Sequence, residues 1–216
     1  MDKRKLGIIP ILVILAIGWL IENGSIHLNQ EQVVTEVNVD QLLDNKLIEV
    51  DSCDLSGDRL KNAKVDIGMD TNYADRDYFG YTNSNKQLVY VHADNIIAQN
   101  DTEENGGSNR YCRDEAKVEG VENDQLDEGH VIADSLGGVS NAYNITPQNS
   151  YLNRFGTQAE LEDEMREALY SGSSVTNFNA YITYEDKSMI PTEYQISYEI
   201  DDTLKSHDFI NDGQEI

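Results

Sequence analysis

The sequence is poor in positive charge. Its 216 residues contain 16 Lys and Arg against 40 Asp and Glu, which gives a formal net charge of −24 at pH 7. Without residues 1–21, the remaining chain holds 13 basic and 39 acidic residues, a charge of −26. A surface of this sign repels polyanions at long range. The composition therefore counts against nucleic-acid binding by a broad basic face, but it allows a small positive site supplied by a metal ion.

Long hydrophobic runs are absent after residue 21. The one such run, Leu6–Ile21, is sixteen residues long and follows Lys3, Arg4 and Lys5. It is longer than a typical signal-peptide core but short of the roughly 20 residues that span a bilayer comfortably. The basic flank favours export of everything that follows it. Residues 1–21 are thus predicted to be a signal peptide or an N-terminal membrane anchor. The chain is predicted to be extracellular, either secreted or anchored to the outer face of the plasma membrane.

Cysteine is scarce as well. Cys53 and Cys112 are the only two, and their separation excludes a zinc ribbon and a CxxC redox motif. In an exported chain two options remain, one disulfide that closes a long loop or two free thiols. We favour the disulfide.

Composition divides the rest of the chain into three parts. Residues 22–45 are polar with scattered Val and Leu, as expected of a stalk or linker. Residues 46–202 carry the patterned segments and form one predicted domain. Residues 203–216 are predicted to be a flexible tail, and the chain has no internal repeat.

Residues 157–170, TQAELEDEMREALY, are typical of a helix. Apolar residues recur there every four positions, at Leu161, Met165 and Leu169. Thr157 with Glu160 matches a capping box, and Gly172 is expected to end the helix. Residues 86–97, 178–185 and 193–200 have the β-branched, aromatic or alternating composition of strands, and the last two are expected to pair as antiparallel neighbours.

Residues 127–153 hold the chemistry-bearing segment, DEGHVIADSLGGVSNAYNITPQNSYLN. A neutral imidazole such as that of His130 takes a proton from water near pH 7, which is the task of a general base. Hydrolysis of a phosphodiester also requires a cation on the phosphate oxygens. Magnesium keeps most of its waters and often takes only one or two protein oxygens. A single amide carbonyl, such as that of Asn153, is therefore enough to hold it.

The ordered set DxGH, NITPQ, LN and a helix containing LEDE is similar to the DNA/RNA non-specific endonucleases. These are ββα-metal (His-Me finger) enzymes, and they include the Serratia-type secreted nuclease and the DNA-entry nuclease of competent streptococci. The resemblance implies an α+β fold in which helices pack on an antiparallel sheet. It also implies endonucleolytic cleavage of DNA, with RNA as an alternative substrate, with 5′-phosphate products and with Mg²⁺ or, alternatively, Mn²⁺ as cofactor.

The resemblance also assigns roles to individual residues. Asp127 and His130 belong to the DxGH turn, and His130 is the base that activates water. Asn153 is the magnesium ligand, and Glu162 on the helix orders the waters of the ion. The amide segment supplies two residues that position the loop or a phosphate, Asn144 and Gln148.

One departure from the family pattern concerns charge. The family arginine that follows the aspartate of the turn is Glu128 here, so a residue expected to be positive near the phosphate is negative. The arginine that clamps the substrate usually lies upstream of the turn in this family. Arg110 is our first candidate for it and Arg113 the second.

A second departure concerns spacing. Asn153 and Glu162 are nine residues apart, which places them about 180° apart on an uninterrupted helix. Both face one ion only if the helix begins after Asn153. Gly156 and a helix start at residue 157 predict such a break, and Glu160 is the alternative carboxylate.

Each of these residues also fits a purely structural role. A lone His130 would be a surface or capping histidine, and Asn144 and Gln148 would be turn formers. Glu162 would lie on a solvated helix face and pair with Arg166.

Two other functions are open for the chain as a whole. The first is a catalytically weak or inactive membrane-anchored relative that acts as a binding module, which the negative charge and Glu128 favour. The second is a toxin or competence component that works only with a cationic partner protein.

Overall fold

The computed structural model describes residues 42, 45–50, 58–70, 74–100, 118 and 125–212. All of them belong to one unit, residues 34–216. The predicted signal or anchor segment, most of the predicted stalk and four singled-out residues lie outside the described ranges: Cys53, Cys112, Arg110 and Arg113. Within the described ranges, no helix is long and apolar enough to cross a membrane.

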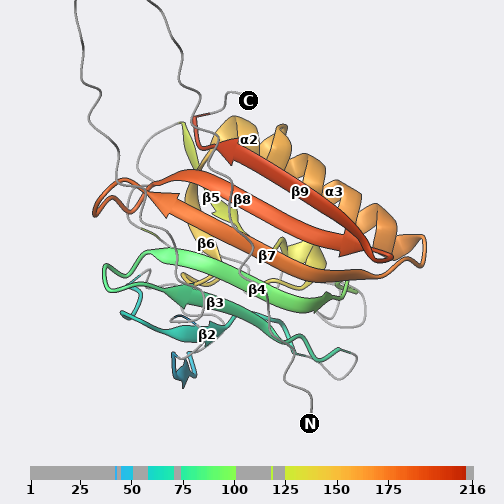
Figure 1. The fold of residues 1–216 in the computed structure, drawn as a ribbon, viewed down its shortest axis with the longest axis horizontal. Helices are drawn as coiled ribbons and strands as arrows, with labels where there is room; N and C mark the ends of the chain where they lie inside the picture. Colours follow the sequence, from blue (N-terminus) through green and yellow to red (C-terminus); the bar gives the residue numbers. More distant parts are fainter. Residues whose placement is uncertain are drawn as a thin grey trace, which may run out of the picture. The chain divides into compact units, whose positions relative to one another are not determined.

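Seven strands form the main sheet, in the order β1-β2-β3-β4-β7-β8-β9 (Figure 1). β1 and β2 are parallel, and every other neighbouring pair is antiparallel. The strands are β1 (Leu47–Ile48), β2 (Lys64–Asp66), β3 (Tyr78–Thr82), β4 (Leu88–Ile96), β7 (Val175–Tyr184), β8 (Pro191–Ile200) and β9 (Thr203–Ile210).

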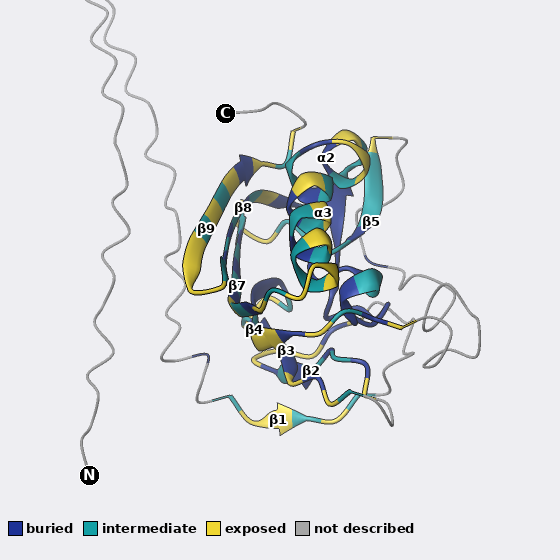
Figure 2. Ribbon diagram, turned by 90° about the vertical axis from the view of Figure 1, so that its right-hand side faces the viewer, coloured by how far each residue is buried: buried dark blue, intermediate teal, exposed yellow. Residues whose placement is uncertain are grey.

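A second, two-stranded sheet is followed directly by the helices. It pairs β5 (Leu126–His130) with β6 (Ile145–Asn149), and its connection contains a short 3-10 turn, η1 (Asp134–Leu136). Next come α2 (Ser150–Arg154) and α3 (Thr157–Tyr170). Figure 2 shows α2, α3 and β5 on the same side of the main sheet. The predicted α+β class, with helices packed on a largely antiparallel sheet, is therefore confirmed.

The core lies between α3 and the main sheet. Leu161 and Met165 of α3 are buried, as the four-residue spacing predicts. Alternate residues of β7 and β8 are buried against them, since side chains alternate between the two faces of a strand. These core residues of the sheet are Phe178, Ala180, Ile182, Tyr194, Ile196 and Tyr198. The predicted helix at 157–170 and the antiparallel strand pair are confirmed.

The start of α3 differs from the prediction. Gly156, not Thr157, is the residue that caps the helix, and no side chain accepts a hydrogen bond there. The capping box of Thr157 and Glu160 was therefore wrong, because Thr157 already has helical geometry one position inside the helix. The C-terminal end agrees with the prediction, since Gly172 follows the helix with a φ of 92°, a conformation that suits glycine.

The predicted flexible tail was wrong for residues 203–210, which form β9. Asp201 and Asp202, with φ of 46° and 62°, turn the chain tightly between β8 and β9. Positive φ at both residues of a two-residue turn matches the twist of an antiparallel hairpin. Phe209 is buried, and its ring stacks on that of Tyr194 with 5.1 Å between centroids. This burial fixes the strand at the edge of the sheet, where most of its other side chains are exposed (Figure 2).

Side chains attach the β5–β6 hairpin to the rest of the molecule. Arg59 is buried and donates from Nε to the Ala142 oxygen and from Nη2 to the Ile145 oxygen, both at 2.5 Å. Desolvation lowers the pKa of this guanidinium. On the other side, the hydroxyl groups of Thr146 and Tyr194 lie 2.8 Å apart. The hairpin is thus held by polar contacts to carbonyl and hydroxyl groups, outside the ladder of the main sheet.

Candidate active site

The loop after His130 is closed by Asn144. This side chain is fully buried, accepts a hydrogen bond from the Ile132 N–H at 3.0 Å and donates to the Ile132 and Val139 oxygens at 2.8 and 3.0 Å. Gly138 packs so closely on it that an added Cβ would lie 2.7 Å from the Asn144 Nδ2. Of the two predicted roles of Asn144, the geometry therefore supports the positioning of the loop and does not support contact with a phosphate.

His130 is the last residue of β5 and is half-buried. Its Nε2 lies 3.0 Å from the Oγ of Ser140, a fully buried residue of the same loop. Its backbone oxygen accepts a hydrogen bond from the Gln158 Nε2 at 3.3 Å. The ring is therefore held by the loop that Asn144 closes, and the backbone beside it is tied to the first turn of α3.

Asp127 joins β5 to α2. Its carboxylate accepts hydrogen bonds from Asn153 Nδ2 at 3.2 Å, from Ser150 Oγ at 3.1 Å and from Arg154 Nε and Nη2 at 2.7 and 2.6 Å. Burial acts to raise the pKa of this carboxyl, but the hydrogen bonds from Arg154, Asn153 and Ser150 outweigh it, and the pKa lies below its usual range. Asp127 is therefore ionised near neutral pH, and it fixes which way the Asn153 amide faces.

The orientation of the Asn153 amide is fixed by Asp127. Because Nδ2 donates to Asp127, the carbonyl oxygen Oδ1 is turned away from that carboxylate and is presented as an acceptor. Asn153 lies in α2, and the helical conformation is interrupted at Phe155 and Gly156 before α3 begins. The predicted interruption between Asn153 and Glu162 is therefore present.

Glu162 lies on the buried side of α3. It is half-buried, and its Oε1 accepts a hydrogen bond from Gln158 Nε2 at 2.6 Å. Desolvation raises the pKa of this carboxyl to about 7. Arg166, the expected partner of a solvated Glu162, instead pairs with Asp163. Glu160, the alternative carboxylate, is exposed in the first turn.

Gln148 lies in β6 opposite Asp127 of β5 and is buried. It is packed against Gly129, where an added Cβ would come within 2.7 Å of its side chain. Its Oε1 is enclosed, and no group in the described part of the chain donates to it. Glu128, which stands in place of the family arginine, lies between Asp127 and Gly129 on β5 and is half-buried.

Three residues at this junction were not identified from the sequence: Ser140, Arg154 and Gln158. Arg154 directly follows Asn153 in the sequence, and this position alone would have predicted a positively charged side chain beside the site. Ser140 and Gln158 meet His130 only through tertiary structure.

Among the described residues, no cluster of three or more His, Cys, Asp or Glu is arranged to hold a metal. Asn153 Oδ1 and the Glu162 carboxylate are both oxygen donors, the type of ligand that a largely hydrated hard cation such as Mg²⁺ prefers.

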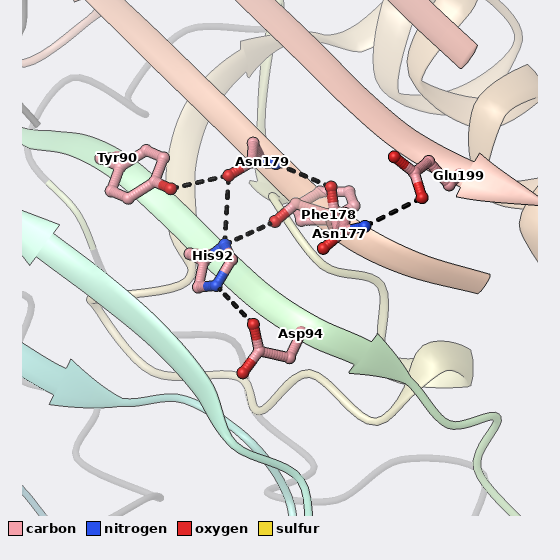
Figure 3. A network of polar contacts seen from close by, with 7 residues as sticks. All are labelled: Tyr90, His92, Asp94, Asn177, Phe178, Asn179 and Glu199. Carbon is pink, nitrogen blue, oxygen red and sulfur yellow. Dashed lines mark hydrogen bonds and ion pairs between the residues drawn. The ribbon is translucent and has the colours of Figure 1, made fainter. Parts of the chain in front are cut away.

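A second polar cluster surrounds His92 on β4 (Figure 3). Its Nδ1 lies 3.1 Å from the Phe178 oxygen and from Asn179 Oδ1, and its Nε2 lies 3.1 Å from Asp94 Oδ1. Val91 and Ala93 are part of the core, so His92 between them faces the opposite side of the sheet. The cluster contacts the irregular part of β7 between Thr176 and Asn179. None of these contacts involves His130.

Comparison with known proteins assigns the family. Residues 69–202 match the family model described as DNA/RNA non-specific endonuclease. The chain belongs to this family. The resemblance drawn from DxGH, NITPQ and LEDE is therefore confirmed at the level of the family.

Curated relatives match this family member over a limited stretch. The type VII secretion system protein EssD of Staphylococcus aureus is 36% identical over 78 residues, in strain USA300 and in strain NCTC 8325 / PS 47. The matched stretch is 34% of this chain and 13% of EssD, so the chain matches only a small part of the length of these relatives.

Solved nuclease structures are also similar. NucA from Streptococcus agalactiae with no metal bound is 16% identical, with a TM-score of 0.49, and the match covers 67% of this chain and 74% of NucA. The structure of NucA with a magnesium ion bound gives 14% identity, a TM-score of 0.49 and coverages of 68% and 77%. The Sda1 nuclease with a bound zinc ion is 21% identical, with a TM-score of 0.38 and coverages of 41% and 39%.

Proposed function

We propose that this chain is an exported, Mg²⁺-dependent endonuclease that cleaves DNA with little sequence preference. The observation that carries the proposal is the junction of β5, α2 and α3. Asp127 binds Asn153 across β5 and α2, and Gln158 binds both the His130 backbone and Glu162 across β5 and α3. Two links therefore support the proposal: one joins Asp127 to Asn153, and the other joins the His130 backbone to Glu162 through Gln158.

In this mechanism His130 is the general base. Its imidazole takes a proton from a water molecule, the water oxygen attacks the phosphorus, and the bond from phosphorus to O3′ breaks. The O3′ leaving group takes up a proton from solvent, and the phosphate stays on the 5′ end. A bound Mg²⁺ would supply positive charge to the phosphate oxygens. Asn153 Oδ1 would hold that ion, Mn²⁺ would serve in its place, and Glu162 would accept hydrogen bonds from its waters.

The charge of the chain sets limits on how substrate binds. Arg154 is neutralised by Asp127, with which it forms an ion pair of 2.6 Å. The positive charge at the phosphate would therefore come mainly from the metal ion, with Arg110 and Arg113 as proposed clamps. RNA, which carries the same phosphodiester, is the second proposed substrate.

The proposed location is outside the cell. Leu6–Ile21 with its basic flank supports export, as a secreted protein or one anchored to the outer face of the plasma membrane. One matched relative is named as a protein of a secretion system, which also supports export.

The test is nicking of supercoiled plasmid by the purified chain with Mg²⁺ and with EDTA. We expect nicking with Mg²⁺ only. The His130→Ala variant is expected to lose about 10²- to 10⁴-fold in rate, because general-base catalysis is removed. His92→Ala is the matched control, since His92 lies on the other face of the sheet, and it should nick at close to the wild-type rate per folded molecule. Wild-type activity that survives in His130→Ala would contradict the assignment.

The competing function is a catalytically inactive binding module, which Glu128 and the net charge of −24 favour. A wild type that binds DNA or a protein partner but never nicks plasmid would support it. Nicking that appears only after a cationic protein is added would instead support dependence on such a partner.

A further inference from the structure

Gln158 is a buried polar residue in the first turn of α3 to which the proposed reaction assigns no task. Its side chain is fully enclosed. Its Nε2 donates to Glu162 Oε1 at 2.6 Å and to the His130 backbone oxygen at 3.3 Å. One amide group therefore connects the carboxylate of α3 with the end of β5.

Packing alone does not account for a glutamine here. Its Oε1 is buried, and no described residue donates a hydrogen bond to it. A buried polar atom without a partner destabilises the folded protein, whereas an apolar side chain of the same shape does not carry this cost. Methionine has nearly the same length and would fill this space without the cost. What glutamine adds over methionine is the Nε2 donor and its two contacts.

The geometry of α3 explains what those contacts do. Gln158 and Glu162 are four residues apart, so both side chains lie on the same face of the helix. A glutamate side chain has several rotamers, and the hydrogen bond at 2.6 Å selects among them. The second contact ties the same amide to β5. The Glu162 carboxylate is thereby held in a fixed place relative to His130.

We propose that Gln158 is a positioning residue: its amide holds the Glu162 carboxylate beside the end of β5, in the orientation that orders the waters of the catalytic cation. The inference rests on the proposed function and deepens it. Gln158 acts through Glu162 and not on the substrate.

The test compares Gln158→Met with Gln195→Met. Gln195 also donates from Nε2 to a glutamate, Glu193, but it lies on the opposite face of β8 from the core residues Tyr194 and Ile196. Gln158→Met is expected to lower kcat for plasmid nicking about 10- to 100-fold and to weaken the affinity for Mn²⁺, measured by electron paramagnetic resonance without substrate, by a similar factor. KM should change little, and Gln195→Met should match the wild type in both measurements.

Stability and coupling distinguish positioning from a structural role. With EDTA present, Gln158→Met should unfold close to the wild-type temperature, because the unpaired buried Oε1 is removed while Glu162 Oε1 and the His130 oxygen lose their donor. In a Glu162→Ala background, Gln158→Met should lower kcat by less than about threefold, since a residue that acts through Glu162 has nothing left to position. A merely structural role would give equal losses in both backgrounds.

Each remaining outcome overturns a different claim. An active wild type with an equally active Gln158→Met overturns this inference and leaves the proposed function standing. A wild type that never nicks DNA overturns the proposed function and the inference with it. If Gln158→Met does not fold, Gln158→Glu keeps the shape and a polar group but lacks the amide donor. At alkaline pH, where its carboxylate has no proton to donate, it should show the same loss of kcat, and an active Gln158→Glu would contradict the inference.

Discussion

At the scale of single residues, the site places a carboxylate where the folded protein disfavours its charge. Glu162 is half-buried, and desolvation raises its pKa from 4.5 to about 7. Because the pKa is higher in the folded state, the contribution of this group to stability is fully present below about pH 4.5 and is lost as the pH rises to about 7. At alkaline pH an ionised Glu162 therefore costs stability, as is common for groups kept for function.

This cost gives a measurable prediction. In EDTA near pH 8, Glu162→Gln should raise the free energy of unfolding by about 1–2 kcal/mol, because no buried charge remains. Near pH 4 the wild type is protonated, and the two proteins should unfold alike in thermal melts. Glu167→Gln, an exposed change on the same helix, should show no such pH-dependent gain. A Glu162→Gln protein that is less stable than the wild type at pH 8 would contradict the assigned burial.

Residue types at the site were predictable where a chemical task limits the choice. His130, Asn153 and Glu162 belong to the small set of groups that move protons or hold a hard cation, and their order along the chain indicated the family. Ser140 and Gln158 act as hydrogen-bond partners, a task that many polar residues perform. Their identification required the fold, which brings β5 and α3 together.

At the scale of elements, α2 depends on the end of the chain. Asn149 caps α2, since its side chain accepts from the Tyr151 N–H at 2.9 Å. The backbone N–H of Asn149 donates in turn to Asn211 Oδ1 at 2.7 Å, and Asn211 Nδ2 donates to the Pro147 and Pro191 oxygens at 3.0 and 2.9 Å. A residue just past β9 therefore fixes the start of the helix that carries Asn153.

We expect Asn211→Ala to lower the free energy of unfolding by about 1–3 kcal/mol, because it leaves partly buried backbone groups without partners. Plasmid nicking should also fall, through displacement of α2. The exposed change Ser206→Ala on β9 is the control and should alter neither denaturant unfolding nor nicking rate. Equal unfolding midpoints for Asn211→Ala and the wild type would refute the anchoring role.

Elements with strong periodicity were predictable, and β9 was not. The apolar stripe of α3 and the alternation in β7 and β8 indicate their structure directly. In β9 burial alternates, but the more buried positions before Phe209 are Lys205 and His207, so no alternation of apolar and polar residues marks the strand. Its turn is formed by Asp201 and Asp202, and two adjacent aspartates are a weaker hairpin signal than Asn-Gly or Asp-Gly. The capping box at Thr157 failed because Gly156 took the capping position.

At the scale of the whole molecule, the protein and its proposed nucleic-acid substrate carry charge of the same sign. The chain has a formal charge of −24, and like charges repel over a distance that salt shortens to about 10 Å at 0.1 M. Most nucleic-acid-binding proteins lose affinity as salt rises, because Lys and Arg release counterions from the phosphates. This chain should behave in the opposite way over the range where screening dominates.

At constant Mg²⁺, kcat/KM for plasmid DNA should therefore rise between roughly 10 and 150 mM NaCl. Bis-p-nitrophenyl phosphate, a phosphodiester with a single charge, serves as the control, and its hydrolysis should respond much less. A steep fall of kcat/KM with salt would reveal a basic footprint and contradict this view of substrate approach.

The β5–β6 hairpin forms its own small sheet, and contacts such as those of Arg59 and Asn211 attach it to the larger one. Release of the hairpin would also break the core packing of Ile145 and the backbone hydrogen bonds from Met69 to Gly137 and from Val139 to Ile67, but no pairing within the seven-strand ladder. Mild denaturant should then abolish plasmid nicking before circular dichroism shows any loss of β-strand. Amide protons of residues 126–149 should exchange faster than those of β7 and β8.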